Sequence, residues 1–270
     1  AMPELPEVEA TCRQVRPAVE GRRILSVSVL RASAVKPQRP ARLVRLATGR
    51  TIKDVRRRGK NILIDLSGGL TIRVHLRISG DLEVRENGED SPFDRVVFQV
   101  ARRRRLVFAD PRALGVVNIH ATREVPALLA DLGPEPLSAA FTLHGFLEQA
   151  ARSRQPAKLF LMDQRRVAGL GNIYAAEALF HAGIRPSVRM SRLTGPRLET
   201  LHLAIVSILR DAVQSTTIAY SRPGRVREAE SFTRFVYGRE GDPCYVCGRK
   251  IRRIAQGGRS TYYCPGCQQR

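Results

Sequence analysis

Two neighbouring stretches, RTIKDVRRRGKNILIDL (residues 50–66) and LTIRVHLRI (residues 70–78), decide the fold of the first half of the chain. In both, apolar and polar residues alternate or form short β-branched runs, which is typical of strands with one buried face. Similar segments, separated by Gly, Asn, Asp or Pro, continue from Arg22 to about His120. The sequence therefore predicts an all-β unit there, a sandwich of short antiparallel strands.

Helical patterns account for most of the remaining chain. Residues 4–20 begin with prolines and acidic residues, which suit a helix N-terminus, and they carry an apolar stripe at helical spacing. The segment LGPEPL (132–137) is typical of a linker, and helical patterns follow it up to residue 215. The arginine-rich segment 217–231 shows no period, so we predict a mobile surface loop.

The charge of the chain points to a polyanionic partner. Its 270 residues include 46 Lys and Arg against 25 Asp and Glu, a formal net charge of +21. Nucleic acid is the first candidate and an anionic membrane surface is the second. No apolar run reaches a membrane-spanning length, and no signal pattern opens the chain, so we expect a cytosolic protein. A basic protein that uses charge only for bulk binding is the alternative.

Four of the five cysteines form two close pairs, with sixteen residues between the pairs. This spacing is typical of a tetrahedral zinc site, whereas two disulfides would require a secreted protein. The predicted ligands are Cys244, Cys247, Cys264 and Cys267. Cys12 stands alone in a helical pattern, and we expect it to be a small buried residue.

Basic and glycine-rich motifs suggest phosphate contacts, each with a plainer alternative. The runs VRRRGK (55–60) and ARRRR (101–105) suit phosphate binding, although solvated strand edges also carry such charge. In GLGN (169–172), glycines before a helix suit phosphate approach, but a tight helix–turn–helix connection explains them equally well. The turn DPRALG (110–115) suits insertion of a basic and an apolar group into a duplex, or is an ordinary loop.

Taken together, these motifs resemble the formamidopyrimidine-DNA glycosylase and endonuclease VIII family of base-excision repair enzymes. The resemblance runs along essentially the whole chain in one order. The segments that carry it are PELPEVE (3–9), RRGK (57–60), HLRISG (75–80), DPRALG (110–115), LGPEPL (132–137), KLFLMDQRRVAGLGNIYAAEALF (158–180), VYGREGDPCYVCG (236–248) and GGRSTYYCPGC (257–267).

The resemblance implies an α+β multidomain fold. Residues 1–131 would form an N-terminal helix and a β-sandwich catalytic domain. Residues 132–231 would form a helix–two-turn–helix DNA-binding domain with a flexible lesion-capping loop, and residues 232–270 a zinc finger. One zinc ion would be structural, because four protein thiolates leave no coordination position for water.

The resemblance also implies a mechanism and its residues. An N-terminal proline has a secondary amine that is partly unprotonated near neutral pH, and it would attack the sugar C1′, release the damaged base and leave a Schiff base. β- and then δ-elimination would follow. The implied catalytic residues are Pro3 as nucleophile, Glu4 as acid–base residue, Lys60 as proton donor, and Arg259 for the second elimination.

The resemblance also implies which residues contact DNA. Lys158 and Asn172 match phosphate-contacting positions, and Arg112 matches the arginine that fills the space left by a flipped base. Ile78 and Leu114 stand where 8-oxoguanine-specific members usually have Met and Phe. The implied partner is damaged double-stranded DNA, bound by a monomer in the cytoplasm, and associated with the nucleoid in a bacterium.

These departures leave the preferred lesion open. Leucine offers less area than phenylalanine and no π face, isoleucine is stiffer than methionine, and Phe93 replaces a DNA-contacting histidine. We therefore do not name 8-oxoguanine as the main substrate. A different or broader set of oxidised bases, or weak base excision with retained lyase action, is compatible with these residues.

The residues in front of Pro3 also affect the expected activity. If Ala1 and Met2 precede it, the nitrogen of Pro3 is a planar amide that cannot form a Schiff base. We expect Ala1-Met2 to be a cloning remnant or a deliberate block. The natural chain is then expected to start at Met2 and to lose this initiator methionine. Two other functions stay open: a damage-binding protein on the same scaffold that is non-catalytic or only a lyase, and a zinc-ribbon RNA-binding protein.

Overall fold

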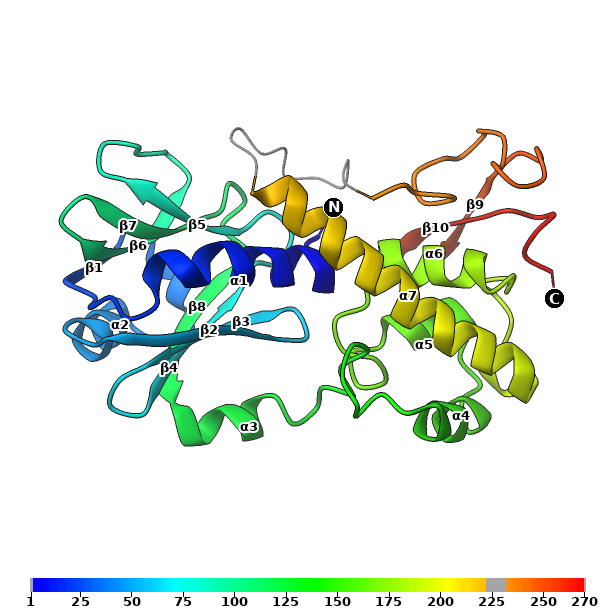
Figure 1. The fold of residues 1–270 in the computed structure, drawn as a ribbon, viewed down its shortest axis with the longest axis horizontal. Helices are drawn as coiled ribbons and strands as arrows, with labels where there is room; N and C mark the ends of the chain where they lie inside the picture. Colours follow the sequence, from blue (N-terminus) through cyan, green and yellow to red (C-terminus); the bar gives the residue numbers. More distant parts are fainter. Residues whose placement is uncertain (1, 222–231, 270) are drawn as a thin grey trace. The chain divides into compact units, whose positions relative to one another are not determined.

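The alternating segments between residues 26 and 121 form two four-stranded antiparallel sheets (Figure 1). The structure is a computed structural model, and it describes residues 2–221 and 232–269. The first sheet has the order β1-β6-β7-β5 and the second the order β2-β3-β4-β8. Their strands are β1 Ser26–Val29, β2 Ile52–Arg58, β3 Asn61–Leu66, β4 Leu70–His75, β5 Asp81–Glu86, β6 Asp94–Ala101, β7 Arg104–Ala109 and β8 Val116–Ala121.

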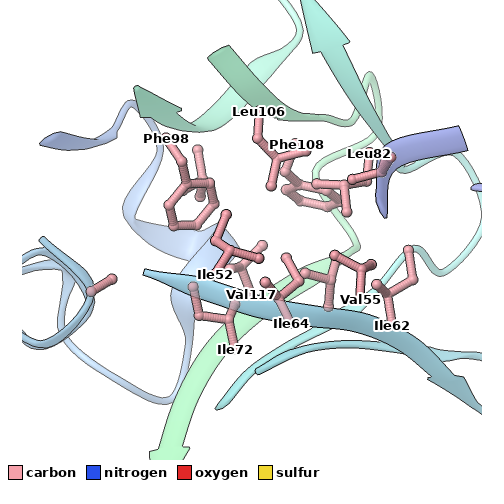
Figure 2. Close-up of a cluster of buried hydrophobic side chains, with 14 of the residues drawn as sticks. Ile52, Val55, Ile62, Ile64, Ile72, Leu82, Phe98, Leu106, Phe108 and Val117 are labelled. Atoms are coloured by element: carbon pink, nitrogen blue, oxygen red, sulfur yellow. The ribbon is translucent and has the colours of Figure 1, made fainter. Parts of the chain in front are cut away.

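The core of the sandwich is apolar and lies between the two sheets. Ile62 and Ile64 of β3 face Phe98, Leu106 and Phe108 of the other sheet (Figure 2). Because side chains alternate along a strand, each sheet supplies one apolar face to this core. The predicted sandwich is confirmed, and burial of these side chains is its main source of stability.

Helix α1 (Leu5–Val19) packs against β2 and β5 of the sandwich. Its apolar stripe, including Leu5, Val8 and Cys12, is buried. Burial raises the pKa of the Cys12 thiol to about 12, so this cysteine is a packing residue, as predicted. Three short elements complete this part of the fold: α2 Pro40–Ala47 and the 3-10 turns η1 Ala32–Val35 and η2 Thr122–Glu124.

Helices and one hairpin form the remaining chain. The helices are α3 Val125–Leu128, α4 Leu143–Ala151, α5 Ala157–Met162, α6 Asn172–His181 and α7 Gly195–Tyr220, with a 3-10 turn η3 Met190–Arg192. The hairpin pairs β9 (Arg252–Gln256) with β10 (Arg259–Tyr263). No helix in the described part of the chain is long and apolar enough to cross a membrane.

One predicted loop is partly helical. Residues 217–220 of the segment expected to be mobile form the last turn of α7. The β-branched residues Thr216, Thr217 and Ile218 hid this extension in the sequence, because they have lower helix propensity. The segment 217–231 is also where the lesion-capping loop is expected, and residues 222–231 of it lie outside the described residues.

The described residues fall into two compact units. The first contains residues 2–130 and 216–221, and the second contains residues 131–215 and 232–269. The helical segment and the cysteine-rich segment, which the sequence suggested as separate domains, therefore belong to one unit. The boundaries at 131 and 231 stay a prediction.

Candidate active site and nucleic-acid interface

A cavity in the first unit brings together residues from four parts of the sequence. Its volume is about 270 Å³. It contains three of the predicted site residues, Pro3, Ile78 and Arg112. The other lining residues are Glu7, Thr11, Leu76, Ser79, Gly80, Asp81, Pro111 and Tyr220.

The first turn of α1 fixes the position of Pro3. Glu4 is the N-cap residue, and its backbone N–H donates to Oε2 of Glu7 at 2.9 Å. Thr11 donates its hydroxyl to the carbonyl of Glu7 at 2.9 Å. Both carboxylates are buried. This arrangement places the acidic start of the chain at the cavity. Glu7 lines the cavity, and Glu4 is the residue that follows Pro3 in the chain.

Lys60 lies at the tip of the β2–β3 hairpin. The hairpin closes with a two-residue loop, Gly59-Lys60, in which Gly59 has a φ of 58°. Glycine suits the first position of such a loop because it adopts positive φ without steric cost. Arg57 holds the tip to α1: it donates to Oε2 of Glu9 at 3.0 Å and to the carbonyl of Gly59 at 3.0 Å. Lys60 does not line the cavity itself.

The sequence analysis did not single out His75. Its imidazole lies close enough to Lys60 for the positive charge of the lysine to lower the pKa of His75. Burial lowers the pKa of His75 to about 4, and repulsion by Arg77, Arg73 and Lys60 adds to this shift. Its Nδ1 accepts a hydrogen bond from the backbone N–H of Arg77 at 3.0 Å. The imidazole is therefore neutral at pH 7.

Two loops at one end of the sandwich carry the residues expected to enter DNA. The β4–β5 loop holds Ile78, and the β7–β8 loop holds Arg112 and Leu114. Each loop contains one non-glycine residue in the left-handed region, Arg77 with φ 56° and Ala113 with φ 52°. Such backbone conformations cost about 1–3 kcal/mol, so the surrounding contacts must hold them.

The buried carboxylate of Asp110 provides those contacts. Its Oδ2 accepts the backbone N–H groups of Leu114 at 2.8 Å and Gly115 at 2.7 Å. Its Oδ1 accepts the N–H of Arg112 at 3.1 Å and the hydroxyl of Ser79 in the other loop. One carboxylate therefore binds the backbone of the β7–β8 loop and a side chain of the β4–β5 loop. The sequence analysis missed this role, although the aspartate lies inside DPRALG.

Glycine is required beside this carboxylate for a steric reason. A Cβ at Gly115 would lie 2.6 Å from Cζ of Phe108, and one at Gly80 would lie 2.4 Å from the carbonyl oxygen of Leu76. Both distances are far below van der Waals contact. The loops therefore pack directly on the core, and their tips are exposed: 38% for Ile78 and 48% for Leu114. Phe93 is 46% exposed, and its carbonyl accepts the N–H of Asp110 at 2.8 Å.

In the second unit, α5 and α6 hold the hairpin that carries Arg259. Asn172, the first residue of α6, donates to the carbonyl of Ser260 at 3.1 Å. Lys158 of α5 donates to Oγ1 of Thr261 at 3.2 Å. Arg259 itself is exposed beside the turn formed by Gly257 and Gly258. The predicted residues Lys158, Asn172 and Arg259 are thus brought together.

The burial of Lys158 changes its expected role. The sequence analysis predicts a phosphate contact, but the side chain is 0% exposed and its ammonium faces Thr261. In this structure Lys158 therefore supports the strand next to Arg259 and does not face solvent. Helical periodicity alone does not reveal this, because the partner strand lies about a hundred residues later in the sequence.

The four cysteines converge at the end of the same hairpin. Their Sγ atoms all lie within 4.8 Å of one another. The Cys244–Cys267 and Cys247–Cys264 Sγ distances are 3.8 and 3.4 Å. Zn–S bonds of about 2.3 Å place the sulfurs of a tetrahedron about 3.8 Å apart, so the thiols fit one zinc ion. The zinc is structural, since all four positions around it are taken by protein.

Another residue that the sequence analysis missed, Glu177, ties α6 to the cysteine-rich segment. Its buried carboxylate accepts three backbone N–H groups, from Phe235 at 2.8 Å, Val236 at 3.1 Å and Tyr237 at 2.8 Å. Burial raises the pKa of Glu177, and the three donors oppose that shift. Because both oxygens accept from N–H groups, the geometry suits the ionised form. In the sequence, the sign of this role is a single glutamate within the otherwise apolar segment AAEALF (175–180).

Comparison with known proteins matches this architecture over nearly the whole chain. Residues 2–117 match the formamidopyrimidine-DNA glycosylase N-terminal domain, and residues 132–222 match the formamidopyrimidine-DNA glycosylase H2TH domain. Residues 241–270 match the zinc finger found in FPG and IleRS. The chain belongs to the formamidopyrimidine-DNA glycosylase family.

Individual family members are similar along their full length. The formamidopyrimidine-DNA glycosylase of Chloroflexus aurantiacus is 40% identical over 99% of this chain and 98% of its own. That of Gluconobacter oxydans is 41% identical over 99% of this chain and 100% of its own. The Lactococcus lactis enzyme in complex with Fapy-dG-containing DNA superposes with a TM-score of 0.91 at 31% identity, covering 99% and 100% of the two chains. The family resemblance predicted from the sequence motifs is thus confirmed.

Proposed function

We propose that this protein is a base-excision-repair DNA glycosylase with AP lyase activity, acting on oxidised bases in duplex DNA. The observation that carries the proposal is the shared cavity: Pro3 lines the same space as Ile78 and Arg112. In a form of the chain that begins at Pro3, the proline amine would therefore face the space that a nucleotide displaced by these loops would enter.

The proposed reaction starts at Pro3. In the form of the chain that begins at Pro3, the secondary amine of this proline attacks the sugar C1′, the glycosidic bond breaks, and the base leaves with a proton supplied by the protein. Glu4 is the proposed acid–base residue, since its carboxylate adjoins Pro3 in the fixed first turn of α1. Loss of the C2′ proton from the Schiff base then drives β-elimination of the 3′ phosphate, and δ-elimination of the 5′ phosphate follows.

The remaining predicted residues bind and orient the DNA in this proposal. Lys60 is assigned to phosphate contact and proton donation from its anchored hairpin tip, and Arg259 to the second elimination. Asn172 and Lys158 act by holding the strand beside Arg259. Arg112, with Ile78 and Leu114, fills the gap in the duplex. The net charge of +21 supplies the salt-dependent attraction to the DNA backbone.

The similar structures support DNA as the partner. Solved relatives are complexes with DNA that contains Fapy-dG, an abasic site or carbocyclic 8-oxo-G. We propose that the protein acts as a monomer in the cytoplasm, where chromosomal DNA would be its substrate. Leu114 and Phe93 are tied to Asp110 by backbone hydrogen bonds, and Ile78 precedes Ser79, whose hydroxyl donates to the same carboxylate, so the three departures from the 8-oxoguanine pattern lie on two connected loops. We therefore propose a broader range of oxidised bases.

The decisive experiment is borohydride trapping with two forms of the protein. One form begins at Pro3 and the other retains Ala1 and Met2. Each is incubated with duplexes that contain a panel of oxidised bases or an abasic site. The form beginning at Pro3 should be trapped covalently, and the extended form should not, because its Pro3 nitrogen is an amide.

Three outcomes would count against the proposal. Absence of trapping by the Pro3 form on every duplex would remove catalysis, and duplex affinity without nicking would favour the damage-binding alternative. Preference for RNA over duplex DNA in competition would favour the alternative of a zinc-ribbon RNA-binding protein. Glu4→Gln should lower the trapping rate, whereas the exposed Glu20→Gln at the other end of α1 serves as its control.

A further inference from the structure

A second cavity lies in the helical unit, where the loop after α6 meets the start of α7. Its volume is about 400 Å³. It is lined by Ser187, Val188, Arg189, Arg192 and Arg197. None of these residues takes part in the proposed glycosylase reaction.

Main-chain hydrogen bonds fix the walls of this cavity. The carbonyl of Val188 accepts the N–H of Ala157 at 2.7 Å, and the N–H of Met190 donates to the carbonyl of Gln155 at 3.0 Å. Arg197 donates from Nη2 to the carbonyl of Gly183 at 3.3 Å. Arg189 and Arg192 therefore project from a loop that these bonds hold in place, and Arg197 projects from the first turn of the long helix α7.

The basic residues of the cavity lack a carboxylate partner within the described part of the chain. Among residues 2–221 and 232–269, no carboxylate forms an ion pair with Arg189, Arg192 or Arg197. Elsewhere in this unit, Arg239 pairs with Asp242 and Arg253 with Glu240. Three like charges that line one cavity repel one another, and an anion bound among them would reduce that repulsion.

Two further features favour an anion. The positive end of the α7 dipole lies at Gly195, and α7 is 26 residues long. Ser187 adds a hydroxyl donor to the lining. Guanidinium groups bind phosphate oxygens with paired N–H donors, and three of them together suit a group with several such oxygens.

We propose that this cavity binds phosphate groups of diphosphate size, at a site separate from the Pro3 cavity. The groups would belong either to a free diphosphate, such as that of a nucleotide, or to two successive phosphates of a nucleic-acid strand. The inference does not depend on the glycosylase reaction, because it uses none of the residues assigned to it.

The test measures binding of inorganic pyrophosphate to the full chain by isothermal titration calorimetry, with zinc content verified before and after. The variant is Arg189→Gln with Arg192→Gln; both side chains are exposed, so their replacement leaves packing intact. The control is Arg123→Gln with Arg210→Gln, which removes the same charge at two exposed sites outside the cavity. We expect at least a tenfold weaker dissociation constant for the cavity variant and less than a twofold change for the control.

A second arm identifies the source of the phosphate. The titration is repeated with the protein saturated by an abasic-site duplex. Unchanged pyrophosphate affinity would assign the cavity to a free diphosphate. Loss of pyrophosphate binding, together with weaker duplex affinity of the cavity variant alone, would assign it to the nucleic-acid backbone.

Equal affinities in the wild type, the cavity variant and the control, or no pyrophosphate binding at all, would overturn the proposal. Borohydride trapping of the cavity variant should match the wild type on a short lesion duplex. Failure of the phosphate site and failure of the glycosylase proposal therefore give different results.

Discussion

Replacing Glu177 tests how the helical segment holds the zinc-binding segment. Its two oxygens accept three backbone N–H groups at 2.8–3.1 Å, and its side chain is 0% exposed. In Glu177→Gln the amide oxygen can keep at most the two donors at one position, and the NH₂ group then faces the third. We expect a loss of about 2 kcal/mol for one unsatisfied donor, and about 4 kcal/mol for Glu177→Ala, which removes all three bonds.

Hydrogen exchange at residues 235–237 measures this effect directly. If these amides exchange by local opening, about 2 kcal/mol lowers their protection about 30-fold, and about 4 kcal/mol about 1000-fold. Zinc release to a chelator should accelerate in the same order, because the segment leads into the first cysteine pair. Glu199→Gln, an exposed glutamate on α7, is the control and should change neither rate. Wild-type protection in Glu177→Gln would refute the reasoning.

Three further changes test other parts of the site. Asp110→Asn replaces one of the two acceptor oxygens that hold the loops with an NH₂ donor, and it should lower kcat/KM on a lesion duplex about 10- to 100-fold. The exposed Asp131→Asn should not; equal kinetics would contradict the assigned loop role. The unfolded pKa of His75 is 6.5 and its folded pKa about 4, so its contribution of about 3 kcal/mol is present above pH 6.5 and is lost as the pH falls toward 4. The free energy of unfolding, measured by denaturation between pH 7.5 and 4, should therefore fall less steeply with pH in His75→Gln than in the wild type. Identical slopes for the two proteins would argue against this role of His75. Cys264→Ser should reduce bound zinc, measured by atomic absorption, whereas Cys12→Ala should retain one zinc per chain.

The sandwich and the zinc site were predictable because their signals are local and periodic. Alternation in residues 50–78 fixes which face of each strand is buried, and two cysteine pairs are recognised by spacing alone. The roles of Asp110 and Glu177 were not predictable in this way. Each depends on which backbone amides the fold brings to a carboxylate, and Glu177 finds its partners almost sixty residues later.

Lys158 shows the same limit from the opposite direction. Its motif matched a phosphate-contacting position, but a lysine in a short helical segment gives no sign of the strand that covers it. The arginines of the second cavity also appear in the sequence as ordinary surface charge, since Arg189, Arg192 and Arg197 form no motif. Their common orientation becomes visible only when the start of α7 and the preceding loop are placed together.

The Asp110 carboxylate separates the support of the two DNA-facing loops from their tips. It binds backbone N–H groups and the Ser79 hydroxyl, and it makes no bond to the side chains of Ile78, Arg112 or Leu114. Evolution can therefore exchange those tip residues without rebuilding the loops beneath them. A library randomised at positions 78 and 114 should yield mostly folded proteins with divergent lesion preferences, which makes this pair a practical starting point for engineering repair enzymes with chosen specificity.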